Sequence, residues 1–410
     1  MLSHWLLYSH DALGLGHARR MTGIARAVLP GRPDLSALLV TCSPQIDALP
    51  VPPGLAYVKL PSARKLSATQ YVARTMRLEP DRLRDLRASI LEEVVRSFQP
   101  DLFLCDKSPC GLMGELAPTL DRLRTDSPAT RTVLGWRDIL DSPERVRAEW
   151  RRSNLLAHVD RWYDELWVYG DPALFDMREE YDLPPAIAER VRYLGYLAPA
   201  VSREALADAR AELETLAPGG AGAGPIALVT VGGGEDGEVL IARWLAAVRA
   251  RLLPANLRSV VVTGPLMPED AQLRIAAGAP PSTTVTRYIG GLEAYAAAAD
   301  LVVGMAGYNT VCEALAAGTA TVLVPRTSQR GEQRLRASRL AARGLVDIVD
   351  TPELSPESLA GATLRALERG RRTGGTGLAL DGYTRVTQEM DRVLPPEMLS
   401  PAKAQRKIGA

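Results

Sequence analysis

The sequence lacks the features that mark several large classes of protein. It has 4 cysteines in 410 residues, too few for a disulfide framework, so a reducing compartment suits it best. A formal net charge of +1 provides no field for holding nucleic acid or an anionic membrane. No uncharged apolar run approaches the roughly 18 residues that span a bilayer, and no basic stretch typical of a signal peptide precedes the first apolar run. We therefore expect a soluble, cytoplasmic protein with no nucleic-acid partner and no transmembrane segment; peripheral contact with a membrane stays open.

The remaining composition is that of an ordinary globular chain. Hydrophobic residues make up 46% and charged residues 24%, and the length suggests two or three domains. Short apolar runs alternate with longer helical patterns, which is typical of a parallel sheet covered by helices on both faces. In the first half, the runs predicted as strands are residues 4–9, 35–41, 101–105, 131–135, 165–169 and 191–195.

The alternation stops at residues 202–224 and then begins again. This stretch reads as a polar helix followed by a Gly/Ala/Pro-rich segment, which we interpret as a linker. The second series of strands is predicted at residues 226–231, 259–263, 283–287, 301–303, 321–324 and 346–349. We therefore predict an α/β protein with two Rossmann-like domains facing a cleft. The predicted boundaries are 1–200, 201–224 for the linker, 225–382, and 383–410 for a C-terminal helix and flexible tail.

A Gly-Leu-Gly-His-Ala-Arg-Arg turn at residues 14–20 follows the first predicted strand. In open α/β sheets such a turn lies at the carboxyl edge, where ligands bind. The dipole of the helix that begins there disfavours a protonated imidazole, so His17 is expected to stay neutral, as a general base must. The other interpretation is a capping histidine beside a tight turn. The two readings of His17 have about equal weight.

Asp106 comes directly after another buried strand and is the candidate partner for His17. Its carboxylate either orients the imidazole, as in a catalytic triad, or caps the turn that follows. No Asp-x-Asp pair occurs in the sequence, which argues against the metal-dependent class of sugar transferases. We expect no metal and no other cofactor.

Two glycine-rich turns mark the second domain. The first, Gly232-Gly233-Gly234, closes a strand and can form an anion-binding nest of backbone N–H groups, although an ordinary tight turn has the same composition. The second leads through Gly307-Tyr308-Asn309-Thr310 into a helix whose free N–H groups can face a diphosphate. Glu313, one turn into that helix, either accepts hydrogen bonds from ribose hydroxyls or complements the helix dipole.

The second domain resembles the nucleotide-sugar half of MurG-like, family-28 glycosyltransferases. The resemblance rests on the pattern G-x-x-G-Y-N-T-V-x-E at residues 304–313, a strand ending in proline, and Glu332-Gln333 about twenty residues further on. The glycine-rich turns near Gly16 and Gly232 occupy corresponding places, so the resemblance covers most of the chain. It implies the GT-B fold, with an acceptor-side N-terminal domain and a nucleotide-sugar-binding C-terminal domain.

The same resemblance implies a role for each matching residue. Glu313 would bind the ribose of a UDP-sugar, and Gly307 to Thr310 would lie by the diphosphate. Gly16 and the three-glycine turn would belong to the donor-binding residues. Tyr288 and Ile289 would meet the uracil through the main chain, and Glu332 and Gln333 would touch the sugar hydroxyls. The chain departs from the family in having Gly234 where a serine is usual, Glu332 where a glutamine is usual, and Arg19-Arg20 after the histidine.

The function expected from these residues is an inverting, metal-independent glycosyltransferase. It would move a sugar from a UDP-sugar to an acceptor hydroxyl deprotonated by His17, alone or paired with Asp106. Two alternatives remain: a nucleotide-sugar hydrolase, in which water replaces the acceptor, and a non-catalytic subunit that binds nucleotide sugars. Neither the acceptor nor the donor sugar can be predicted from the sequence.

Overall fold

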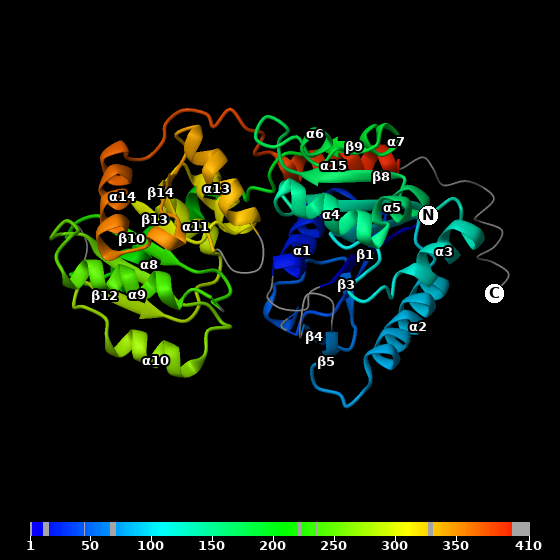
Figure 1. Ribbon diagram of the computed structural model, residues 1–410, viewed down its shortest axis with the longest axis horizontal. Helices are drawn as coiled ribbons and strands as arrows, with labels where there is room; N and C mark the ends of the chain where they lie inside the picture. Colours follow the sequence, from blue (N-terminus) through cyan, green and yellow to red (C-terminus); the bar gives the residue numbers. More distant parts are fainter. Residues whose placement is uncertain are drawn as a thin grey trace.

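The protein consists of two α/β domains side by side, as the computed structural model shows (Figure 1). The structure describes residues 2–10, 16–44, 46–65, 71–219, 223–234, 236–326 and 331–395. The predicted α/β class and the pair of parallel sheets are confirmed. None of the helices in these described ranges combines the length and the hydrophobicity needed to cross a membrane.

The N-terminal domain is built on a seven-stranded parallel sheet with the order β3-β2-β1-β6-β7-β8-β9. Its strands are β1 (Ser3–Ser9), β2 (Leu35–Thr41), β3 (Leu55–Lys59), β6 (Leu102–Asp106), β7 (Arg131–Arg137), β8 (Glu165–Tyr169) and β9 (Val191–Tyr193). Each central strand is buried along almost its whole length, because helices cover both faces of the sheet. A small antiparallel hairpin, β4 (Ala63–Lys65) and β5 (Tyr71–Ala73), stands outside this sheet.

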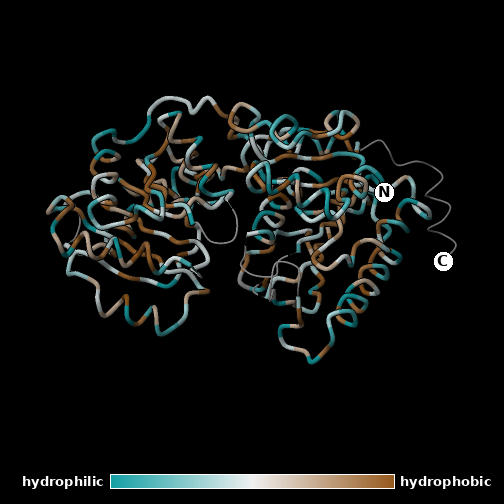
Figure 2. The backbone as a smooth tube through the Cα atoms, in the orientation of Figure 1, coloured by the Kyte–Doolittle hydropathy of each residue, from teal (hydrophilic) through white to brown (hydrophobic). Residues whose placement is uncertain are grey.

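Helices connect these strands and form the two outer layers of the domain. They are α1 (Gly16–Val28), α2 (Pro80–Phe98), α3 (Ala117–Asp126), α4 (Pro143–Ser153), α5 (Leu155–Trp162), α6 (Met177–Glu180) and α7 (Pro185–Ala188), with short 3₁₀ turns at Leu29–Gly31 and Ile46–Ala48. Apolar residues concentrate in the interior of both domains, along the strands (Figure 2).

The C-terminal domain repeats the plan with a six-stranded parallel sheet in the order β12-β11-β10-β13-β14-β15. Its strands are β10 (Ile226–Thr230), β11 (Arg258–Val262), β12 (Thr283–Thr286), β13 (Leu301–Gly304), β14 (Ala320–Leu323) and β15 (Asp347–Ile348). Its helices are α9 (Glu238–Arg249), α10 (Glu269–Ala277), α11 (Leu292–Ala298), α12 (Tyr308–Ala317), α13 (Glu332–Ala342) and α14 (Pro356–Arg369), with a 3₁₀ turn at Thr351–Glu353.

The structure shows on which domain each of the two helices packs that were predicted to lie outside both domains. The helix α8 (Arg203–Leu216), predicted as part of a linker, packs into the C-terminal domain, because Ala209 and Leu213 face the apolar layer over β10. The last helix, α15 (Gly382–Val393), crosses back and packs on α1 of the N-terminal domain (Figure 1). The chain therefore crosses between the domains near Leu197 and again near Asp381, which pair in an isolated bridge. The tail predicted to be flexible lies, from residue 396 on, outside the described residues.

The strand order reverses once in each sheet, and the sequence motifs lie at those two places. In the first sheet the reversal falls between β1 and β6, whose carboxyl ends lead to His17 and to Asp106. In the second it falls between β10 and β13, which lead to Gly232 and to the start of α12. Ligands of open α/β sheets bind in the crevice at such switch points. The topology thus directs the four motifs toward the space between the domains.

Candidate active site

The first turn of α1 and the end of β6 bring His17 and Asp106 together. The imidazole Nδ1 lies 2.5 Å from Oδ2 of Asp106. Asp106 is completely buried, and the His17 side chain is 17% exposed. Because β1 and β6 are neighbours in the sheet, residues that follow them in sequence meet although 89 positions separate them. The carboxylate of Asp106 therefore contacts the imidazole, as one of its two predicted roles requires.

Arg20 holds the same carboxylate from the other side. Its Nε donates to Oδ1 of Asp106 at 3.0 Å and its Nη2 donates to Oδ2 at 2.8 Å. Burial alone would raise the pKa of Asp106, but Arg20 and His17 outweigh it and hold that pKa well below its ordinary value. Asp106 is therefore an anion with a fixed orientation.

The geometry also decides which nitrogen of His17 can act as a base. Burial lowers the pKa of His17 to about 3, and Asp106 only partly opposes this effect. The ring is neutral at pH 7, and its Nδ1 lies 2.5 Å from Oδ2 of Asp106 and 2.8 Å from Nη2 of Arg20. Since an ionised carboxylate can only accept, we assign the proton to Nδ1 on the shorter of these two contacts. Nε2 is then the nitrogen with a lone pair for an incoming proton. The sequence predicted a neutral His17 because of the helix dipole, whereas burial is the main cause in the structure.

His10 is a neighbour that the sequence analysis did not connect to this cluster. Its ring centroid lies 4.3 Å from that of His17, and its Nδ1 lies 3.3 Å from the backbone oxygen of Asp106. Among the described residues, His10, His17 and Asp106 form the group whose ligand atoms, all within 4.8 Å, could hold a metal ion. A cation there would lie beside the Arg20 guanidinium, which already occupies the carboxylate. This repulsion favours the predicted metal-free site.

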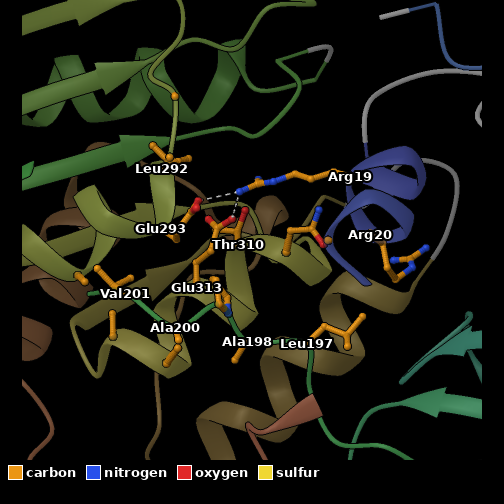
Figure 3. A pocket seen from close by; sticks show the side chains of 18 of the residues that line it. Arg19, Arg20, Leu197, Ala198, Ala200, Val201, Leu292, Glu293, Thr310 and Glu313 are labelled. Carbon is orange, nitrogen blue, oxygen red and sulfur yellow. Dashed lines mark hydrogen bonds and ion pairs between the residues drawn. The ribbon is translucent and has the colours of Figure 1, made fainter. Parts of the chain in front are cut away.

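A cavity of about 1270 Å³ lies between the two domains. The N-terminal domain contributes the start of α1 and part of α15, and the C-terminal domain contributes the turns after β10 and β12 and the start of α12 (Figure 3). Eight of the predicted donor-binding residues line it: Gly16, Gly232, Gly233, Tyr288, Ile289, Asn309, Thr310 and Glu313. Residues more than 290 positions apart thus face one space.

Glu313 is the acid of this cavity that is best shielded from solvent. It is 4% exposed, and burial raises the pKa of its carboxyl to about 7, although Arg19 opposes the rise. Arg19 reaches from α1 across the cavity, with Nη2 at 2.9 Å from Oε1 of Glu313 and 3.0 Å from Oε2 of Glu293 (Figure 3). The predicted ribose ligand is therefore paired with a guanidinium of the opposite domain.

The three-glycine turn divides into a part that faces the cavity and a part that packs. Gly232 and Gly233 line the cavity, and Gly232 has a φ of +63°. Gly234 has a φ of +100°, and a Cβ there would come within 2.3 Å of the Thr263 backbone oxygen. A serine could not take this conformation without a shift of the Thr263 turn, so the glycine that departs from the family pattern is required by packing. Gly234 does not line the cavity.

Neither Tyr308 nor Gly307 lines the cavity. The Tyr308 ring is buried between the guanidinium groups of Arg20, 5.7 Å from its centroid, and Arg336, 5.8 Å away. Its hydroxyl accepts a hydrogen bond from the backbone N–H of Leu197 at 3.1 Å. The Tyr308 side chain therefore joins the two domains, and Gly307 is the N-cap of α12. The place of these two residues by the diphosphate stays a prediction.

Glu332 and Gln333 are also outside the cavity lining. Both are buried at the start of α13, where Arg326 donates to Glu332 from its side chain and to Gln333 from its backbone N–H. The neighbouring Gly331 N–H donates to Oδ1 of Asp141 in the N-terminal domain at 2.7 Å. This helix start is therefore docked against the other domain, and contact of Glu332 and Gln333 with sugar hydroxyls stays a prediction.

A buried ion pair that joins the two domains was not predicted from the sequence. Arg336 of α13 donates to both carboxylate oxygens of Asp138, at 2.7 and 2.6 Å, and both side chains are completely buried or nearly so. The Tyr196 hydroxyl adds a third hydrogen bond to Asp138 at 3.2 Å. No sequence signal joins two charges 198 positions apart; the only hint was Asp138 at the end of a buried strand.

Comparisons with known proteins agree with this division into two domains. Residues 227–373 match the family model described as the glycosyltransferase family 28 C-terminal domain. A stretch of 138 residues is 36% identical to part of a protein of Paenarthrobacter aurescens named UDP-N-acetylglucosamine–N-acetylmuramyl-(pentapeptide) pyrophosphoryl-undecaprenol N-acetylglucosamine transferase. That match covers 33% of this chain and 36% of the relative, so about a third of the relative's length is spanned. The C-terminal domain is thus similar to the family 28 C-terminal domain, and the predicted MurG-like resemblance is confirmed.

The whole chain matches solved structures at the level of the fold. The glycotransferase of kitacinnamycin aligns over 96% of this chain and 100% of its own, with a TM-score of 0.61 and 16% identity. MurG from Acinetobacter baumannii aligns over 94% and 95%, with a TM-score of 0.55 and 16% identity. A UDP-N-acetylglucosamine 2-epimerase aligns over 96% of both chains, with a TM-score of 0.58 and 11% identity. These similarities confirm the predicted GT-B fold.

Proposed function

We propose that the protein is an inverting, metal-independent glycosyltransferase that moves a sugar from a UDP-sugar to an acceptor hydroxyl. The observation that carries this proposal is that the two places where the strand order reverses, one in each sheet, face one cleft. The first brings Gly16 and Arg19 to the cavity lining, beside a neutral histidine oriented by a buried aspartate. The second supplies a glycine turn, a helix start and a buried glutamate. A base and a nucleotide-sugar site on opposite domains suit transfer between two substrates.

The donor half of the proposal rests on the C-terminal domain. Gly232, Gly233 and the free N–H groups at the start of α12 face the cavity and can stabilise a diphosphate without a metal. Glu313 can accept hydrogen bonds from the vicinal hydroxyls of a ribose, and Tyr288 and Ile289 can meet the base through their backbone. The relative named above is a transferase of N-acetylglucosamine from UDP, and the similarity supports a UDP-sugar as the donor here.

The chemical half rests on His17. In the proposed step Nε2 removes the proton of the acceptor hydroxyl, and the oxygen forms a bond to the anomeric carbon. The bond from that carbon to the β-phosphate oxygen breaks, and its electron pair leaves with UDP. Attack from the side opposite the leaving group inverts the configuration. Asp106 stabilises the imidazolium that forms, as the third member of a catalytic triad does.

Two other functions fit the same fold. A nucleotide-sugar hydrolase would use His17 to activate water, and a binding subunit would hold the nucleotide sugar without reaction. The His17–Asp106 contact favours the two catalytic functions over the subunit, because a binding subunit needs no oriented base. A cleft of about 1270 Å³ favours transfer over hydrolysis, because water needs far less space than a second substrate.

The proposed setting is the cytoplasm, with peripheral membrane contact if the acceptor is a lipid-linked sugar. The four cysteines all lie within the described ranges and form no disulfide there, which fits a reducing compartment. The relative from Paenarthrobacter aurescens carries an undecaprenol-linked acceptor in its name, and an acceptor of that type is one of the candidates to test.

Release of UDP separates the three functions. The protein is incubated with a panel of UDP-sugars, with and without candidate hydroxyl acceptors, and UDP is measured over time. Release that requires an acceptor supports the proposed transferase. Release without any acceptor indicates a hydrolase, and binding without release indicates a subunit; either result contradicts the proposal.

A further inference from the structure

Arg19 links the two domains across the cavity through ion pairs with carboxylates of the facing domain. It lies on the first turn of α1, two residues after His17, and extends to Glu313 and Glu293 of the C-terminal domain (Figure 3). Its neighbour Arg20 turns the other way, toward Asp106. One helical turn thus carries the proposed base, the cation that fixes the base's partner, and a cation that reaches the proposed donor site.

The other arginines that line the described part of the cavity are held by different groups. Arg20 is bound to Asp106, Arg26 donates to the Pro50 backbone oxygen, and Arg371 donates to backbone oxygens of Ala297, Ala299 and Ala317. Arg19 is therefore the lining arginine whose hydrogen-bond and ion-pair partners are side-chain carboxylates of the facing domain. Its side chain is 39% exposed, so its guanidinium can change partners without itself becoming a buried, unpaired charge.

The present partner of Arg19 is the group that the donor needs. Glu313 cannot give the same oxygen both to the guanidinium and to a ribose hydroxyl at full strength, so nucleotide binding competes with the ion pair. A diphosphate offers a guanidinium a stronger partner than a single carboxylate, because several charged oxygens can accept its fork of N–H groups. The glycine turn at Gly232 and Gly233 lines the same cavity as Arg19.

We infer that Arg19 is the diphosphate-binding cation of the donor site and that it exchanges Glu313 for the diphosphate when a UDP-sugar binds. The exchange frees the carboxylate of Glu313 for the ribose and places a positive charge where negative charge grows as UDP leaves. It also makes donor binding depend on a residue of the N-terminal domain. This inference rests on the proposed function, because it takes the ligand to be a UDP-sugar.

Comparing UDP with uridine tests the exchange. Calorimetry measures the affinity of both ligands for the wild-type protein, Arg19→Ala and Arg19→Lys, with Arg365→Ala as a control that removes an exposed arginine outside the cavity lining. We expect Arg19→Ala to weaken UDP roughly 10- to 100-fold, as expected for the loss of charge-assisted hydrogen bonds. Uridine, which has no phosphate, should bind this variant as well as the wild type or better, since Glu313 has lost its competitor. Arg19→Lys should lie between the two, and Arg365→Ala should match the wild type.

Other outcomes overturn the inference in distinguishable ways. A parallel loss for UDP and uridine would make Arg19 a structural tie between the domains, and a parallel gain would make it a mere competitor for Glu313. Unchanged UDP affinity in Arg19→Ala would also exclude a phosphate contact. If the wild-type protein binds neither ligand, the proposed function itself fails together with this inference.

Discussion

Replacing His17 by alanine tests the proposed base in a part of the molecule where little else should change. Asp106 keeps both hydrogen bonds from Arg20, so no buried charge is left without a partner. The variant loses the contacts of the imidazole with Asp106 and Arg20 and some packing, so we expect the free energy of unfolding to fall by about 1–2 kcal/mol. Catalysis should suffer far more, because general bases contribute roughly 10²–10⁴-fold to kcat. UDP affinity should stay near the wild-type value, since His17 lies outside the lining of the donor cavity.

The assay measures kcat, the melting temperature and UDP affinity on one preparation of His17→Ala. Asp106→Asn is a poor substitute for this variant, because it would also leave the buried Arg20 without its anion. Near-normal turnover in the folded fraction of His17→Ala would refute the assignment of the base. A drop in melting temperature with unchanged kcat would make His17 a structural residue at a tight turn.

The same variant carries a pH signature. The pKa of His17 is about 3 in the folded protein, and the ordinary histidine value is about 6.5. Between these two values the unfolded chain binds a proton that the folded protein does not, so His17 makes the folded state less stable as the pH falls through that window. His17→Ala should therefore lose less stability than the wild type between pH 6.5 and pH 4, as measured by urea denaturation. An identical slope would mean that the histidine titrates normally.

Two further predictions concern metal and domain contact. Excess EDTA should leave turnover intact, since Arg20 already occupies the carboxylate of the one described histidine–aspartate cluster; a loss of activity that Mg²⁺ restores would contradict this. Arg336→Ala should lower the free energy of unfolding by about 3–5 kcal/mol, because it leaves Asp138 as a buried charge without its ion-pair partner. Arg365→Ala, which breaks an exposed pair with Asp347, is the matched control and should cost less than about 1 kcal/mol. Equal effects of the two arginine substitutions in denaturant titrations would exclude a special role for the buried pair.

The sheets could be predicted from the sequence because their strands are buried on both faces. Runs such as residues 101–105 and 226–231 are almost wholly apolar, and the structure places β6 and β10 there at the centre of each sheet. The outer strand β3 was missed, because its residues are largely exposed and its sequence lacks the apolar run. The positions of α8 and α15 were not predictable either, since local pattern gives a helix but not the domain on which its apolar side packs.

The candidate site, like the fold, could be predicted from the sequence only in part. Motifs at strand ends could be placed at the cleft, because parallel strands end at one edge of a sheet. In the structure Gly232 and Glu313 line the cavity, and His17 lies next to the lining residue Gly16 at the start of α1. The orientation of a side chain within a motif could not be predicted. Tyr308 belongs to the same short motif as Thr310, but it faces the domain contact while Thr310 faces the cavity.

The central claim is that the C-terminal face of the cavity binds the UDP of a sugar donor through Glu313. Calorimetric titration of UDP into the wild-type protein and Glu313→Ala tests this claim most directly. The loss of charge-assisted hydrogen bonds to the ribose should weaken binding by about 1–3 kcal/mol, or roughly 5- to 150-fold. UDP affinity in Glu313→Ala equal to that of the wild type, or absence of UDP binding to the wild type, would contradict the account.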